Sequence, residues 1–350
     1  MSPLALLESL VGIPSVSGDE HAIAAFIETW FRARGLHVRR DDRNVEVRVR
    51  GKAPGPVLLF SSHLDVVPTG SGWSTEPFVP VIRDGKMIGR GCNDAKASVA
   101  AMSHAMVALA HDPPATGEIV LALTCEEERG RNGLEKFLPS LGHIDAALVG
   151  EPTGMQPAVA QNGLLLLELT ARGRAGHAAR PHLALNAIDV AVRDVAALHG
   201  LTWEPVNAHV GSMTLVVTQF SAGTVHNVIP GEAALVVDIR TIPEIAPASV
   251  VERVRATVES EVRVRSDRLA PAATPEGARI LAAVLAALPD AKAFGSPTVS
   301  DWAHLKGIPA VKIGPGISEV SHTTDEWVEL AAVEAAAPAY ERIARAFLSV

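Results

Sequence analysis

The chain has 350 residues, 48% of them apolar and 20% charged, which is typical of one large or two ordinary globular domains and excludes disorder. Its formal charge of −8 and lack of Lys/Arg-rich runs argue against nucleic acid and membrane partners. With only Cys92 and Cys125, no secretory leader and no apolar run long enough to span a membrane, we expect a reduced, soluble, cytoplasmic protein.

The first part of the chain alternates strand and helix patterns. A capping box at Ser17–Glu20 predicts the start of a helix. Another helix is predicted over 94–110. Continuous apolar runs predict strands buried on both faces at 56–62, 117–124 and 145–150. This alternation is typical of an α/β fold with a doubly wound, mostly parallel sheet.

The pattern changes near residue 164. Strand and helix patterns then follow in βαββα order, at 164–173, 186–200, 213–220, 233–240 and 247–261. This order predicts a ferredoxin-like α+β domain inserted into the first one. We expect a catalytic domain of 1–163 and 270–350 and an inserted domain of 164–269, with Ala/Pro-rich 270–276 as the return linker.

Five carboxylate and imidazole side chains each lie just past an apolar run with a strand pattern: His63, Asp94, Glu128, Glu151 and His322. An open parallel sheet binds its ligands beyond the carboxyl ends of its strands. Several hard ligands delivered to that edge make a metal pocket, and a pair of ions there can carry out hydrolysis.

A two-metal site gives each of these residues a role. Two triplets that share Asp94 as a bridge bind the two ions: His63, Asp94 and Glu151, and Asp94, Glu128 and His322. Asp65 is placed to hydrogen-bond the His63 ring or its neighbours. Glu127, next to a ligand, is placed to act as the general base on a bridging water. Oxygen and imidazole donors suit two divalent ions, with zinc expected first and cobalt or manganese open.

Each residue also has an ordinary explanation. Asp94 could be only a helix N-cap, Glu126–Glu128 only a solvated acidic turn, and His322 a plain loop histidine. Cys92 and Cys125 are expected to be buried packing residues rather than ligands. The metal site is favoured by the joint pattern, because four segments that follow four strands each carry an acid or a histidine.

Seven local motifs resemble the co-catalytic zinc aminoacylase/acetylornithine deacetylase/succinyl-diaminopimelate desuccinylase family, in order from about residue 8 to the end of the chain. They are SSHLDVVP (61–68), GWSTEPFVPVIRDGKMIGRGCNDAKAS (72–98), TCEEERG (124–130), VGEPTG (149–154), GHAARPHLALNAI (176–188), HNVIPGEAALVVDIR (226–240) and SHTTDEWV (321–328).

The resemblance implies a metal-dependent amidohydrolase that acts on a small N-acyl amino acid and dimerises through the inserted domain. It implies that His177 is supplied by the partner subunit and stabilises the oxyanion, whereas its structural alternative is a turn histidine. It also implies that Asn227 and Arg240 grip the substrate's α-carboxylate, since the Arg fork meets a carboxylate bidentately. The alternative for Arg240 is a surface charge at a strand end.

The substrate rests on a weaker resemblance. The run 300–327 is similar to acetylornithine and acetylcitrulline deacetylases, so N-acetylornithine is the expected substrate. Desuccinylase, lysine-precursor deacylase and dipeptidase or carboxypeptidase activities stay open. Two other classes of protein compete with this interpretation. A non-catalytic, metal-stabilised binding protein is disfavoured by the presence of Glu127. A metal-free hydrolase that uses Ser61 or Ser62 is disfavoured because the sequence has no G-x-S-x-G elbow.

Overall fold

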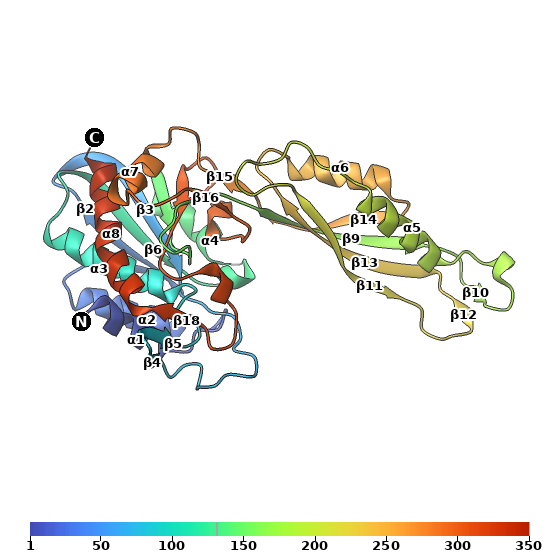
Figure 1. Cartoon of the computed structure of the whole chain (residues 1–350), viewed down its shortest axis with the longest axis horizontal. Coiled ribbons are helices and arrows are strands. Elements are labelled where there is room, and N and C mark those ends of the chain that lie inside the picture. The colour runs from blue at the N-terminus through green and yellow to red at the C-terminus, as the bar shows by residue number, and fades with distance from the viewer. Residues whose placement is uncertain (131, 350) are drawn as a thin grey trace. The chain divides into compact units, whose positions relative to one another are not determined.

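The computed structural model describes residues 1–130 and 132–349, which fall into two compact units (Figure 1). Unit 1 comprises 1–159, 274–294 and 300–350, and unit 2 comprises 160–273 and 295–299. The units therefore change over at 159/160 and 273/274, where the sequence suggested 163/164 and 269/270. No helix in the described part of the chain combines the length and the apolar character needed to cross a bilayer.

The sheet of unit 1 is parallel at its centre. β3 (Ala53–His63) pairs in parallel with both β6 (Thr116–Thr124) and β7 (Ala146–Val149), and β17 (Ala310–Lys312) pairs in parallel with β7. β3 and β6 contain the predicted apolar runs 56–62 and 117–124, and β7 lies within the run 145–150, because a strand covered on both faces needs apolar side chains on both. The predicted α/β sheet is confirmed here.

The outer strands of this sheet are antiparallel. β2 joins the parallel centre through β6, and β8 joins it through β17. The outer strands are β1 (Val38–Asp41), β2 (Asn44–Arg50), β8 (Ala158–Gln161), β15 (Ala272–Ala273) and β16 (Phe294–Ser296). A separate small antiparallel sheet consists of β4 (Val81–Arg83), β5 (Lys86–Ile88) and β18 (Trp327–Glu329).

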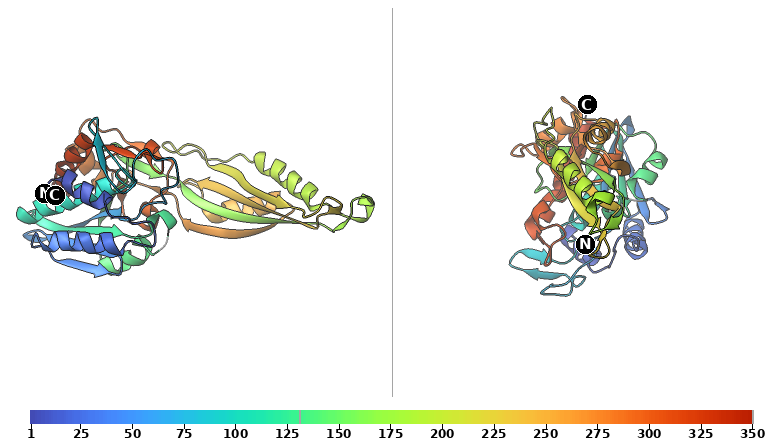
Figure 2. Two further views of the ribbon diagram at one scale, coloured as in Figure 1. Left: turned by 90° about the horizontal axis from the view of Figure 1, so that it is seen from below. Right: turned by 90° about the vertical axis from the view of Figure 1, so that its right-hand side faces the viewer.

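One face of the sheet carries the main hydrophobic core. Alternate strand residues such as Leu58, Phe60 and Leu121 are buried in the same cluster as the helices, as the period of two in a strand requires. Those helices, which can be followed from two further directions in Figure 2, are α1 (Pro3–Val11), α2 (His21–Arg32), α3 (Lys96–His111), α7 (Arg279–Ala287) and α8 (Leu330–Leu348). The short α4 (Leu134–Phe137) contacts β6 and the 3₁₀ turn Asp301–His304.

The predicted capping box at Ser17–Glu20 is wrong. Ser17 Oγ donates to Asp65 Oδ2 at 2.7 Å, and Glu20 Oε1 accepts from the Glu126 amide at 3.0 Å. α2 begins at His21 without a side-chain cap. Both side chains are therefore used in long-range contacts that fix the turns after β3 and β6, which a local motif cannot reveal.

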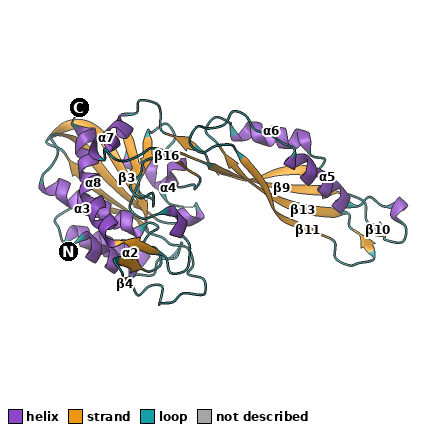
Figure 3. Cartoon of the chain, in the orientation of Figure 1, coloured by secondary structure: helices purple, strands orange, loops and turns teal. Residues whose placement is uncertain are grey.

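Unit 2 is a four-stranded antiparallel sheet in the order β11-β13-β9-β14, with two helices packed on it (Figure 3). Its elements are β9 (Gly163–Arg172), α5 (Ala187–His199), β11 (Thr214–Ala222), β13 (Glu232–Thr241), α6 (Pro247–Thr257), β14 (Glu261–Leu269) and the small ladder of β10 (Gly176–His177) with β12 (Val228–Ile229). The predicted helix 247–261 is too long, and β14 was missed. Arginines alternate with Val262 and Val264 in β14, so its period of two is that of a half-exposed strand.

His104 in α3 is expected to make folding sensitive to acid. Its Nε2 is buried without a hydrogen-bond partner in the described structure, and its ring centroid lies 5.3 Å from that of Trp30. Burial, helped by the charge of Arg34, lowers the pKa of His104 to about 4. The unfolded chain, with a histidine pKa of about 6.5, therefore takes up this proton first as the pH falls.

The stabilisation that comes from keeping His104 neutral is thus complete above about pH 6.5 and is lost as the pH falls toward about 4. Between pH 7 and 5 the free energy of unfolding should fall by about 1 kcal/mol on this account, after a reduction for the partial exposure of the ring. His104→Leu should show a smaller fall in Tm between pH 7 and 5 than the wild type. Thermal unfolding at the two pH values measures this, and equal falls would contradict it.

Candidate metal centre

The carboxyl ends of the parallel strands bring the predicted ligands together. His63 is the last residue of β3 and lies level with Thr124 at the end of β6. Glu127 and Glu128 begin the 3₁₀ turn after β6, and Glu151 follows β7 by two residues. Three neighbouring parallel strands therefore deliver an imidazole and three carboxylates to one edge of the sheet.

Asp94 lies between two histidines. Its Oδ1 is 3.2 Å from His63 Nε2, and its Oδ2 is 3.6 Å from His322 Nε2. Glu151 Oε1 is 3.9 Å from His63 Nε2, and Glu128 Oε1 is 2.9 Å from His322 Nε2. Donors bound about 2 Å from one ion lie at such separations from each other. His63 thus lies near Asp94 and Glu151, and His322 lies near Asp94 and Glu128, while the division of these residues into two triplets that share Asp94 stays a prediction.

Glu127 reaches the same pocket. One oxygen or nitrogen each from His63, Glu127 and Glu151 lie within 4.8 Å of one another, as do those from His63, Asp94 and Glu128. Distance alone allows Glu127 to be a ligand or a base, so its role as base stays a prediction.

Asp65 contacts both the His63 ring and its neighbours, as expected, but through different groups. The His63 Nδ1 is 2.9 Å from the Asp65 carbonyl oxygen, and it is 3.5 Å from the carboxylate. The carboxylate instead accepts the amides of Glu127 at 3.0 Å and Glu128 at 3.2 Å. Asp65 thus orients the imidazole through its main chain and the acidic turn through its side chain.

The turn Glu126–Glu128 is held by specific contacts of Glu126, so its interpretation as a solvated acidic turn is wrong. Glu126 is buried, has a positive φ of 52°, and its Oε1 accepts from Arg43 at 2.8 Å. Arg43 also pairs with buried Glu20. Glu126 is therefore held by Arg43, whereas Glu127 and Glu128 each have a carboxylate oxygen near His63.

Glu326 was missed as a supporting residue. Its Oε1 accepts the amides of Asn93 and Asp94, each at 3.0 Å, and its Oε2 accepts from Gly91 at 3.0 Å and Arg90 at 2.8 Å. This buried carboxylate fixes the loop that carries Asp94. The only local sign of it is its place four residues after His322 in the SHTTDEWV motif.

Two structural alternatives are settled for single residues. Asp94 is not the N-cap of its helix, because α3 begins at Lys96 and the cap is Ala95. Cys92 and Cys125 are both buried and free, and burial raises the pKa of each thiol, as expected for packing residues. His322 is half exposed, yet its Nε2 meets Glu128.

The acids of the cluster are buried close together and repel one another. Burial, aided by the charge of Asp94, raises the pKa of Glu151 to about 8, and burial with the charge of Glu151 raises that of Glu127 well above its ordinary range. Burial disfavours a charged His63, but hydrogen bonds with Asp65 and Asp94 raise its pKa overall. Such a cluster suits cations, since an ion that displaces the shared protons relieves the repulsion.

The other predicted residues lie in unit 2. His177 is exposed, and its Nδ1 accepts from the Ala179 amide at 3.0 Å. Asn227 lies beside it, because its carbonyl accepts from the Ala178 amide at 3.0 Å. Arg240 lies near the end of β13, and the usual rise of a strand puts it roughly 26 Å from Glu232 at the start of that strand. Its Nε donates to Asp238 Oδ1 at 2.9 Å. One chain therefore groups Asn227 with His177 and not with Arg240.

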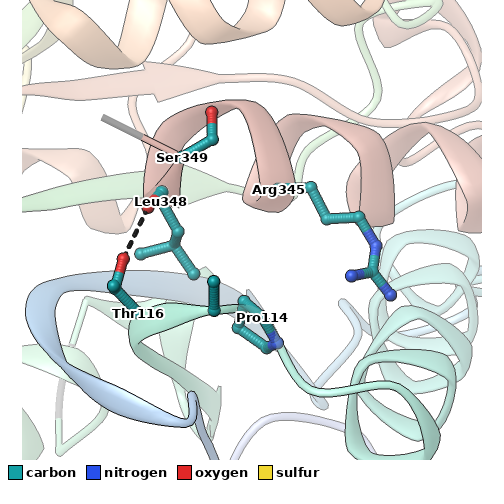
Figure 4. A pocket seen from close by; sticks show the side chains of 6 residues that line it. Pro114, Thr116, Arg345, Leu348 and Ser349 are labelled. Atoms are coloured by element: carbon teal, nitrogen blue, oxygen red, sulfur yellow. Dashed lines mark hydrogen bonds between the residues drawn. The ribbon is translucent and has the colours of Figure 1, made fainter.

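A pocket beside the C-terminal end of α8 has no such chemistry. It is lined by Pro114, Thr116, Arg345, Leu348 and Ser349 (Figure 4). Thr116 Oγ1 donates to the Leu348 carbonyl at 2.8 Å, and Arg345 is paired with Glu341 and Asp112. The polar side chains of Thr116 and Arg345 in this pocket already have protein partners, so the cluster around His63 is the stronger candidate for a functional site.

Comparison with known proteins places the chain among metallopeptidases. Residues 59–346 match the family described as Peptidase family M20/M25/M40. The succinyl-diaminopimelate desuccinylase of Thioalkalivibrio sulfidiphilus is 33% identical over 99% of this chain and 98% of its own. That of Methylibium petroleiphilum is 34% identical over 73% of this chain and 72% of its own.

Solved structures share the fold at lower identity. The aminopeptidase PepT from Bacillus cereus superposes with a TM-score of 0.82 at 20% identity, covering 99% of this chain and 98% of that one. The Bacillus subtilis YXEP protein, a dinuclear metal-binding peptidase of the M20 family, gives 0.79 at 18% identity with the same coverage. Both likenesses extend over the two units.

Proposed function

The chain belongs to peptidase family M20/M25/M40 and is a metal-dependent amidohydrolase, and from this premise we propose that it cleaves the amide bond of a small N-acyl amino acid. Two divalent ions would be held by two sets of residues: His63, Asp94 and Glu151, and Asp94, Glu128 and His322. The observation that carries this proposal is the orientation of Asp94, whose two oxygens face one histidine each. We expect zinc first, with cobalt or manganese as substitutes.

The described residues divide the chemistry between them. Bound divalent ions supply charge that polarises the acyl carbonyl and makes water a better nucleophile. Glu127 takes a proton from the water that attacks the carbonyl carbon, and it returns a proton to the leaving amine as the C–N bond breaks. Asp65 and Glu326 keep the base and the bridging carboxylate in place.

Two substrates lead. The run 300–327 favours N-acetylornithine, in which the acyl group is uncharged. The names of the sequence relatives favour N-succinyl-diaminopimelate, whose acyl group carries a carboxylate of its own. Both are linear amides on the amino group of an amino acid, so the same water attack and proton return serve either one.

The test is a turnover screen of zinc-loaded protein against acetyl, succinyl and dipeptide derivatives of ornithine, citrulline, lysine and diaminopimelate. We expect hydrolysis of at least one N-acyl amino acid, with activity lost on chelation and regained on adding zinc. Metal uptake without hydrolysis of any of them would favour a non-catalytic binding protein. Full turnover by metal-free protein would exclude the two-metal mechanism.

A homodimer through unit 2 is supported by the edge of its sheet. β11 is an outer strand that exposes apolar side chains, with Val216 at 53% and Phe220 at 45% exposure. A long apolar edge strand offers unpaired backbone groups and a surface for a second chain. A second copy that pairs along β11 would cover both, and the role of His177 and Asn227 in the partner's site is part of the same proposal.

Mixing two inactive variants tests this role of His177. Glu127→Gln and His177→Ala homodimers should each turn over slowly while both keep their metal. In a mixed dimer, one of the two sites has both an intact Glu127 and an intact His177 from the partner. Random exchange of equal amounts makes about half of the dimers mixed, so we expect about a quarter of the wild-type activity per site. No recovery in exchanged dimers, checked by sedimentation, would show that His177 acts within its own chain or not at all.

Arg240→Ala should raise KM about tenfold or more for substrates with a free α-carboxylate, because a charged hydrogen-bonded pair is lost. Substrates with an amidated carboxyl should be affected little, and Arg240→Lys should restore only part of the affinity because it lacks the planar fork. Steady-state kinetics on the acid and amide pair measures this. An equal change for both substrates would leave Arg240 with only its Asp238 contact.

A further inference from the structure

Lys312, the last residue of β17, is a buried cation that the proposed reaction does not use. Lys96 and Lys312 are the lysines buried in the described part of the chain. Lys96 Nζ donates to the carbonyls of Leu10 and Ile13, each at 2.9 Å, which gives it a structural role. Lys312 is only 1% exposed, and it lies within electrostatic range of Glu151 foremost, then Glu127 and Asp94.

The backbone fixes Lys312 beside the Glu151 segment. Lys312 is level with Val149 in the parallel pair of β17 and β7, and the next amide, of Ile313, donates to the Val149 carbonyl at 2.8 Å. At Gly314 even a Cβ would lie 2.5 Å from the Glu151 carbonyl oxygen. The main chains of the two segments are therefore adjacent, and this register places Lys312 beside the segment that carries Glu151.

A buried charge without a role is a cost to folding. Replacing one with an apolar side chain of similar size is often neutral or stabilising. Here the surroundings reverse that expectation, because four carboxylates converge on His63. Donor atoms of Glu127 and Glu151, and likewise those of Asp94 and Glu128, lie within 4.8 Å of one another, and carboxylates that close repel one another when charged. A fixed positive charge next to Glu151 offsets part of that repulsion.

We propose that Lys312 is a positioning residue of the metal centre, whose charge stabilises the folded chain when the centre is empty and weakens the binding of cations to it. The second half rests on the proposed two-metal function. The same charge acts in both states: it attracts the carboxylates when they are uncompensated and repels divalent ions when these arrive. Metal affinity is then lower than the ligand set alone would give.

The metal-free protein tests the first half. In the presence of a chelator, Lys312→Met should lower Tm by roughly 3 °C or more relative to the wild type. Lys306→Met, which removes the same charge from an exposed position, should not. Adding Glu151→Gln to Lys312→Met should recover part of the loss, since one uncompensated carboxylate is removed. A Lys312→Met protein that is as stable as the wild type, or more stable, would overturn the proposal.

Metal titration tests the second half. Binding of Zn²⁺ by calorimetry, or of Co²⁺ by its visible absorption, should be about tenfold tighter or more in Lys312→Met. Lys306→Met should stay within about twofold of the wild type, since an exposed charge is screened by solvent and salt. Unchanged or weaker binding in Lys312→Met would overturn the proposal. A wild-type protein that binds no metal would refute the proposed function instead, while the metal-free stabilities would still decide the role of Lys312.

If Lys312→Met does not fold, Lys312→Arg keeps the charge with a different shape. It should fold and bind metal with nearly wild-type affinity. Failure of this variant too would show that Lys312 is needed for its shape and would overturn a role based on its charge.

Discussion

Glu127→Gln is expected to lower kcat by about 10²–10⁴-fold while fold and metal content stay unchanged. The amide keeps the size of the side chain and its place in the turn held by Asp65, whose carboxylate accepts the Glu127 main-chain amide. It cannot take a proton from water, so the attack step loses its base. Single-turnover kinetics measures the chemical step, and metal analysis of the same sample measures occupancy.

The neighbouring Glu128→Gln is the matched control for Glu127→Gln. Glu128 meets His322 at 2.9 Å and is assigned as a ligand, so its amide variant should lose one ion as well as activity. The two substitutions make the same chemical change at adjacent positions of one turn. If Glu127→Gln loses metal to the same extent as Glu128→Gln, Glu127 is a ligand and another group must be the base.

Asp94→Asn is expected to lower metal content from two ions to at most one and kcat by about a thousandfold or more, since the charge stabilisation of the transition state depends on the intact centre. An amide retains one oxygen, which can face His63 or His322 but not both, while the carboxylate faces both. Zinc content per subunit and turnover at saturating zinc measure the two effects. Glu319→Gln, an exposed acid three residues before His322, should keep two ions. Two tightly held ions in Asp94→Asn would show that Asp94 is not the bridge.

The parts of the fold that the sequence could predict are those set by local periodicity. The apolar runs at 56–62, 117–124 and 145–150 lie within or overlap β3, β6 and β7, because strands buried on both faces need apolar residues throughout. His63, Glu128 and Glu151 could be found for the same reason, since each follows such a strand and parallel strands end at one edge of the sheet. Asp94 instead follows β5 of the small antiparallel sheet, and a 3₁₀ turn separates His322 from β17. β14 was missed because its arginines mask its period of two.

The supporting residues could not be found in this way. Ser17 and Glu20 have the local pattern of a helix cap, but their side chains bond to residues 48 and 106 positions away. Glu326 and Lys312 have no neighbours in sequence that suggest an acid or a base in the site. Their partners become adjacent only when the sheet and the C-terminal strands are assembled, so their roles are properties of the tertiary structure.

Glu326 and His322 come from the last tenth of the chain, whereas His63 and Asp65 come from its first fifth. During synthesis the proposed ion pocket is therefore incomplete until the segment that carries His322 and Glu326 has emerged, and fragments that end before it have only part of the pocket. Cations bound there would stabilise the contact between the early and late segments of unit 1. Removing the late segment should therefore weaken cation binding and the packing of unit 1 together.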